Sequence, residues 1–185
     1  MKYNITRSRR KSVTLSVNSD GSLEVKAPLF MKDSEIEKII NDKMGWIIKH
    51  QKKIAVQQAA IEAAGGTLSI AELRELADKA VKYIPERVRY YAPLVGVNYG
   101  RITIRAQRSR WGSCSQKGNL NFNCLLMLAP PEVLDSVVVH ELCHRLEMNH
   151  SDRFYAEVLR VYPDYRKYHK WLKDHGNELM ARLPS

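Results

Sequence analysis

The sequence predicts an α+β protein with a small antiparallel sheet. Apolar residues recur at helical spacing in an early part of the chain, short segments of alternating polar and apolar residues follow, and helical patterns return near the end. An order of helices, then strands, then helices is typical of α+β proteins rather than of doubly wound parallel sheets. A length of 185 residues, 44% of them hydrophobic, suits one domain with a small appendage.

A β-hairpin is predicted near the N-terminus. Residues 12–17 and 22–27 alternate polar and apolar side chains, and the segment 18–21 between them has the sequence Asn-Ser-Asp-Gly. Gly21 can take the positive φ that a tight reversal of two strands requires. Pro28 ends the second predicted strand, because it lacks an amide proton for the sheet.

Two long helices should follow the hairpin. Ser34 and Glu37 fit a capping box, and isoleucines recur at helical spacing until about residue 64, where a Gly-Gly pair breaks the pattern. A second capping box at 69–72 opens a helix that is predicted to end near Tyr91. The chain is therefore divided into an N-terminal hairpin and helix module, residues 1–66, and a second domain, residues 67–185.

Strands and helices are both predicted in the second domain. Residues 101–105 alternate, and residues 119–128 alternate at first and then become continuously apolar. Helices are predicted from the Pro-Pro pair at 130–131 to about Met148, and then over 152–161 and 164–175.

The predicted helix after Pro131 carries the motif HExxH, formed by residues 140–144. Side chains four residues apart lie on the same face of a helix, so His140 and His144 can bind one zinc ion. Glu141 then lies beside the open coordination position, where it can accept a proton from an activated water. The motif predicts a zinc-dependent hydrolase that binds one zinc ion per chain.

A catalytic zinc ion needs a third protein ligand, and His150 is the expected one. The helix must end between His144 and His150 to bring the latter back, and Asn149 tolerates the left-handed conformation that such a turn needs. Glu147 and Glu157 are the competing third ligands, since carboxylates also bind zinc.

The net charge of +10 is unevenly distributed. Residues 1–19 contain five basic residues without an acid, and residues 87–131 contain seven basic residues without an acid. Such a surface favours anionic partners, including nucleic acid, although it is equally explained as a solvated basic face. A nucleic-acid-binding module with a structural zinc, or a protease that acts at DNA, therefore remains an alternative to a plain peptidase.

The cysteines and the lack of a long apolar stretch predict the compartment of the protein. Cys114, Cys124 and Cys143 form no CxxC pair, so they are interpreted as reduced and mostly buried thiols. No run of 18 apolar residues and no signal-peptide pattern is found, which predicts a cytoplasmic protein without contact to a membrane.

Several motifs together resemble the YgjP-like zinc metallopeptidase family. They are Arg110-Trp111-Gly112-Ser113-Cys114, Gly118-Asn119-Leu120, the segment 128–131, the segment 138–144, and Asn149-His150-Ser151 with Phe154. The resemblance is dense over residues 100–176 and looser toward the N-terminus. It implies a zincin-like catalytic domain related to SprT-like and WLM proteases, zinc on His140, His144 and His150, and a protein or peptide substrate.

Three other residues are not expected to carry the chemistry, and the role of Arg110 stays open. His169 and His175 are interpreted as surface histidines of the last helix, and Trp111 as a core residue. Arg110 is either a substrate-binding cation or part of the basic face.

Overall fold

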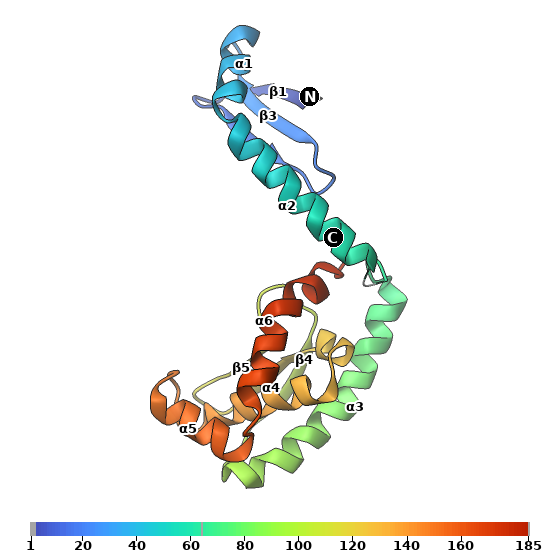
Figure 1. The fold of residues 1–185 in the computed structure, drawn as a ribbon, viewed down its shortest axis with the longest axis vertical. Coiled ribbons are helices and arrows are strands. Elements are labelled where there is room, and N and C mark those ends of the chain that lie inside the picture. Colours follow the sequence, from blue (N-terminus) through green and yellow to red (C-terminus); the bar gives the residue numbers. More distant parts are fainter. Residues whose placement is uncertain (1–2, 64, 185) are drawn as a thin grey trace. The chain divides into compact units, whose positions relative to one another are not determined.

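The computed structural model describes residues 3–63 and 65–184 and divides the chain into two compact units, Met1–Ala63 and Ala64–Ser185 (Figure 1). Both units combine helices with a small sheet, which confirms the α+β class. The division into two independently folding domains stays a prediction. Within the described residues, no helix combines the length and the apolar character needed to cross a membrane.

The N-terminal sheet contains the predicted hairpin and one additional strand. Strands β2 (Thr14–Val17) and β3 (Leu23–Pro28) are antiparallel, and Gly21 between them has a φ of 81°. Strand β1 (Tyr3–Ser8) pairs parallel with β3, which gives the order β1-β3-β2. The sheet is therefore mixed and not purely antiparallel, because the long central strand β3 offers a second edge to the first residues of the chain.

The helical part of the N-terminal unit is two helices and not one. Helix α1 (Asp33–Asp42) ends at Lys43, and helix α2 (Met44–Ala63) begins directly after it. The predicted capping pair Ser34 and Glu37 is wrong by two residues, since the carboxylate of Glu35 accepts a hydrogen bond of 3.0 Å from the backbone amide of Lys32. The reach-back glutamate of a capping box is thus present, but the residue that it caps has no side-chain acceptor.

The C-terminal unit begins with helix α3 (Ile70–Val95), whose predicted capping box is confirmed. The backbone amide of Glu72 donates to Ser69 at 3.2 Å, and that of Ser69 donates to the Glu72 carboxylate at 2.8 Å. The helix continues one turn past the predicted end at Tyr91, because Gly96, with a φ of 86°, is the first residue that can close it in the left-handed conformation.

The second sheet consists of β4 (Ile102–Arg105), β5 (Gly112–Cys114) and β6 (Leu120–Asn123), in the order β4-β6-β5. Strand β4 is parallel to β6 and β5 is antiparallel to it, so this sheet is also mixed. The apolar run after Asn123 is the 3₁₀ helix η1 (Cys124–Leu128) instead of a continuation of the strand, and Cys124, Leu125 and Leu126 are buried in it.

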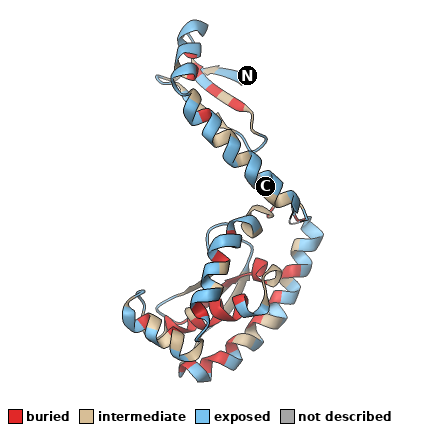
Figure 2. Cartoon of the chain, in the orientation of Figure 1, coloured by how far each residue is buried: buried red, intermediate tan, exposed pale blue. Residues whose placement is uncertain are grey.

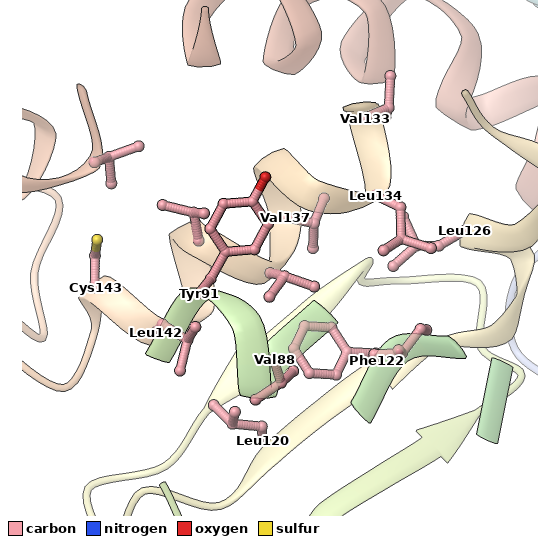
Figure 3. Close-up of a cluster of buried hydrophobic side chains, with 14 of the residues drawn as sticks. Val88, Tyr91, Leu120, Phe122, Leu126, Val133, Leu134, Val137, Leu142 and Cys143 are labelled. Atoms are coloured by element: carbon pink, nitrogen blue, oxygen red, sulfur yellow. The ribbon is translucent and has the colours of Figure 1, made fainter. Parts of the chain in front are cut away.

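Three helices complete the unit: α4 (Pro131–Cys143), α5 (Asp152–Val161) and α6 (Tyr165–Ala181). Ten of the thirteen residues of α4 are buried, and the buried residues of α3 and of the second sheet join them in one cluster (Figures 2 and 3). Helix α4 is therefore the centre of the unit, and a side chain on its polar face is held by a rigid element.

Candidate metal centre

The two histidines of the HExxH motif lie at the C-terminal end of α4. His144 caps the helix in the right-handed conformation, so α4 ends at Cys143, five residues before the predicted position near Met148. Among the described positions, only glycines take the left-handed conformation. The expectation of a left-handed Asn149 in the turn after α4 is therefore wrong. Instead, the Asn149 side chain accepts a hydrogen bond of 3.0 Å from the backbone amide of Ser151, and this turn returns the chain to the helix.

The three histidines converge at this turn. One ligand atom from each of His140, His144 and His150 lies within 4.8 Å of the other two, and the ring centroids are 4.8–5.0 Å apart. The Nε2 atoms of His140 and His150 are 3.0 Å apart. In the part of the chain that the structure describes, no other group of at least three His, Cys, Asp or Glu side chains converges in this way.

The other ring nitrogens of the two helical histidines have hydrogen-bond partners. Nδ1 of His140 lies 2.8 Å from the hydroxyl of Tyr165, and Nδ1 of His144 lies 3.1 Å from the backbone carbonyl of Glu147. A histidine whose Nδ1–H is bound in this manner presents a free Nε2 lone pair, which is the usual orientation of a metal ligand. The Tyr165 hydroxyl also lies 3.2 Å from Nδ1 of His169.

Phe154 supports all three imidazole rings. Its side chain is fully buried, and its ring centroid lies 4.8, 4.6 and 4.9 Å from those of His140, His144 and His150. The ring stacks on His144 and meets the other two edge to face. One aromatic side chain from α5 therefore fixes the spacing of ligands that come from a helix and from a loop.

Glu141 is buried beside the histidines, and burial raises its pKa to about 8. Gly112 of β5 leaves space for this carboxylate: a Cβ atom at that position would lie 2.5 Å from Oε1 of Glu141. Among the described residues, no hydrogen bond to the Glu141 carboxylate is found. A buried carboxylate with a raised pKa is typical of functional sites.

The electrostatics of the two helical histidines favour neutral imidazoles. Burial, followed by the neighbouring His144, His150 and His169, lowers the pKa of His140 to about 3. Burial also lowers the pKa of His144, and the nearby His150 adds to this effect. Neutral imidazole is the form of histidine that binds a metal ion, so the donor set is compatible with one.

The competing ligands are not part of the cluster. Glu147 contributes only its backbone carbonyl to His144, and Glu157 forms an ion pair of 2.8 Å with Arg160. Cys143 is buried, as predicted. Three nitrogen donors, with their Nδ1 partners in place on two of them, fit the zinc ion that a catalytic site of this kind holds.

Three residues near the site were not predicted. The sequence places Tyr165 only in a helical pattern and Gly112 only in the motif around Trp111. His169 is exposed, as expected of a surface histidine, yet it contacts Tyr165. No sequence signal relates Tyr165 to His140, because they are 25 positions apart and the intervening segment includes a turn and a complete helix.

The fold and the histidine triad define a class, that of metal-dependent hydrolases. The family follows from sequence comparison: the chain matches the family described as YgjP-like, metallopeptidase domain, over residues 11–74 and 67–175, and belongs to it. It is therefore a metallopeptidase, which confirms the resemblance and the predicted enzyme class, and its substrates are proteins or peptides.

Two solved structures are similar to part of the chain. The metallopeptidase zymogen abylysin of Pyrococcus abyssi is 18% identical, with a TM-score of 0.45 over 49% of this chain and 93% of that one. The metallopeptidase zymogen jannalysin of Methanocaldococcus jannaschii is 20% identical, with a TM-score of 0.45 over 50% and 96%. A search of curated proteins found no match.

Proposed function

We propose that the chain is a zinc-dependent peptidase in which His140, His144 and His150 hold one zinc ion and Glu141 is the general base. The observation that carries the proposal is the convergence of three imidazoles within 4.8 Å beside a buried glutamate. When bound, a zinc ion polarises the scissile carbonyl and lowers the pKa of a coordinated water to about 7.

Each protein group has a separate task in this mechanism. His140 and His144, on adjacent turns of α4, and His150 would hold the ion, and Tyr165 and the Glu147 carbonyl fix the orientation of the two helical rings. The Glu141 carboxylate takes a proton from the attacking water and returns it to the leaving nitrogen. Phe154 and the apolar cluster beneath it keep bulk water away from the inner side of the triad.

Metal analysis of the purified full chain tests the ligand assignment. We expect about one zinc ion per chain in the wild type, on the basis of one three-histidine site. Loss of an outer partner of a ligand reduces metal affinity by about 10–100-fold, and loss of the ligand itself should reduce it further. We therefore expect zinc affinity to fall by more than about 100-fold in each of the variants His140→Ala, His144→Ala and His150→Ala.

Two matched controls accompany these variants. His175→Ala removes an exposed histidine that faces Glu178, and Glu157→Ala removes the competing carboxylate; both should keep full occupancy. The assignment of the third ligand fails if His150→Ala retains zinc while Glu157→Ala loses it.

A structural zinc is less compatible with this donor set. Structural sites are normally closed by four protein ligands, and cysteine is common among them. The described residues supply three histidines and no fourth ligand, while Cys143 points into the apolar core. We therefore propose an open, catalytic coordination sphere.

Contact with nucleic acid remains a second proposal, limited to weak electrostatic binding. Arg101, Arg105, Arg110 and Lys117 are exposed, whereas Arg87 is bound to Asp135 at 2.7 Å and is not available. Binding of DNA by such residues should fall steeply with salt and show little sequence preference. Peptidase activity measured with and without DNA, at low and near-physiological salt, tests whether this contact matters to the enzyme; activity that ignores DNA at both salts would refute a functional role.

A further inference from the structure

A cationic cavity adjoins the histidine triad. It has a volume of about 560 Å³ and lies along one face of α6, with Tyr155 of α5 on the other side. Three basic side chains, Arg166, Lys170 and Lys173, line it, and Asp174 is the one carboxylate among its described lining residues. The proposed mechanism uses none of these charges.

Two tyrosines of the cavity wall contact the metal ligands. The Tyr165 hydroxyl lies 2.8 Å from Nδ1 of His140, and the ring of Tyr155 stacks near His150 with a centroid separation of 6.3 Å. A group bound in the cavity is therefore separated from the triad by a single layer of side chains. This distance suits a side chain of a substrate whose peptide bond lies at the triad.

The charges of the cavity are not balanced by the protein. Asp174 forms an ion pair with Lys170 one turn earlier on α6. For Arg166 and Lys173, no acidic side chain lies within 4.0 Å among the residues that the structure describes. A concave surface with excess positive charge attracts an anionic group.

A second cavity continues the first along α6. It has a volume of about 350 Å³, shares His169 and Lys173 with the first, and adds Arg108, Trp111 and Met180 to the lining. A single small anion would occupy one cavity only. The two adjoining cavities, which share His169 and Lys173, are here called the α6 groove. Its cationic part and its partly apolar part match an extended peptide that places successive side chains in different environments.

We propose that this groove is the substrate subsite of the peptidase and that its cationic cavity binds an aspartate or glutamate side chain close to the scissile bond. The proposal rests on the proposed function, because it takes the triad as the place of hydrolysis. A peptide is favoured over nucleic acid because Tyr155 and Tyr165 of the cavity wall contact the histidines of the triad, and because the groove joins apolar residues, Trp111 and Met180, to the cations.

Binding is tested separately from hydrolysis. The probes are a fluorescent hexapeptide with two glutamates and its counterpart with two glutamines, titrated into the zinc-loaded, full-length Glu141→Gln variant. The glutamate peptide should bind about fivefold more tightly, the effect of one or two partly exposed charge pairs. Lys173→Glu and Arg166→Glu should each remove this preference; both side chains are exposed, so neither change disturbs the core.

Lys167→Glu is the matched control. It makes the same change of charge on the same helix, but Lys167 lies over the ring of Tyr168 and does not line the cavity. It should keep the preference for the glutamate peptide. Equal binding of the two peptides by the parent protein, or loss of the preference in Lys167→Glu, would overturn the proposal.

Two further measurements separate the possible causes of failure. A thymidine hexanucleotide that binds and loses affinity in Lys173→Glu, while the two peptides bind equally, would assign the cavity to phosphate groups and overturn the proposal. In a peptide mixture digested by the wild type, aspartate and glutamate should be enriched near the cleaved bonds, and the enrichment should disappear in Lys173→Glu. Wild-type protein that binds the glutamate peptide selectively but hydrolyses nothing would count against the proposed function, not against the subsite.

Discussion

The two units of the chain contain sheets with the same strand order and pairing. In each sheet the first strand is parallel to the third and the second is antiparallel to it: β1-β3-β2 in the N-terminal unit and β4-β6-β5 in the C-terminal unit. The first residues of the two central strands, Leu23 and Leu120, are both fully buried. Up to this point the two units differ little in architecture.

The helices that follow the sheets are different. In the N-terminal unit, α1 buries only Ile36 and Ile40 against the sheet cluster. In the C-terminal unit, α4 buries Asp135, Ser136 and Glu141 together with its apolar residues. The same arrangement of strands therefore supports an apolar core in one unit and a chemical site in the other, because function is determined by the side chains that a fold carries.

Helix α4 itself contains two buried carboxylates that differ in their hydrogen-bond partners. Asp135 accepts two hydrogen bonds of 2.7 Å from Arg87 of α3 and one of 3.1 Å from the hydroxyl of Tyr91. Glu141, two turns later, has no hydrogen-bond partner among the described residues. Asp135 ties two helices together through Arg87, whereas burial without such a partner raises the pKa of Glu141 and makes its carboxylate a stronger base.

The largest expected effect is that of Glu141→Gln on hydrolysis. Glutamine keeps the shape of the side chain but cannot accept the proton, so turnover should fall by about 10²–10⁴-fold while zinc occupancy is unchanged. Steady-state kinetics and metal analysis on the same preparation check both statements. Glu147→Gln is the control: its carboxylate lies outside the cluster and accepts no proton in the mechanism, so turnover should stay within about twofold of the wild type. Unchanged turnover in Glu141→Gln would refute the mechanism.

Gly112→Ala should have the next largest effect. The added Cβ would lie 2.5 Å from Oε1 of Glu141, so the carboxylate must move. A displacement of about 1 Å at a catalytic group can reduce the rate by roughly 100-fold, with zinc retained.

Gly100→Ala is the control for Gly112→Ala, because its Cβ would approach a different side chain, Oδ1 of Asn119, at the same 2.5 Å. If both alanine variants lose equal activity, the loss reflects general strain in the C-terminal unit and not the position of Glu141.

Tyr165→Phe should weaken zinc binding. With Nε2 of His140 on the metal, Nδ1 carries the proton and donates it to the Tyr165 hydroxyl, which the phenylalanine lacks. Loss of such an outer partner reduces metal affinity by about 10–100-fold. Competition with a fluorescent chelator measures the affinity, and Tyr155→Phe, whose ring stacks near His150, serves as the comparison. Equal affinity of Tyr165→Phe and the wild type would exclude the orienting role.

The sequence predicts the local features of this site better than its distant ones. The spacing of His140 and His144 follows from helix geometry, and their placement on one face of α4 needs no tertiary information. The turn that returns His150 was expected from a left-handed Asn149, yet it is made by the side chain of that residue. Either conformation satisfies a tight turn, so the residue type alone does not decide between them.

The contacts of Gly112 and Tyr165 could not be predicted from the sequence. Each depends on how a separate element packs on α4: β5 for Gly112 and α6 for Tyr165. The same limit applies to β1 and β4, because a parallel pairing between strands that are distant in sequence is determined by tertiary packing and not by a local turn.

The smallest effect on hydrolysis is expected from Leu23→Ala. Leu23 and Leu120 occupy equivalent, fully buried positions of the two sheets, so each alanine should destabilise its own unit by about 2–5 kcal/mol. If the units fold independently, Leu23→Ala lowers only one of two calorimetric transitions and leaves zinc binding and turnover intact. Leu120→Ala should lower the other transition and reduce zinc occupancy at elevated temperature, since Leu120 shares the cluster that supports α4. A single transition shifted by both substitutions would mean that the chain folds as one cooperative domain, and the difference between the two sheets would then be one of local chemistry alone.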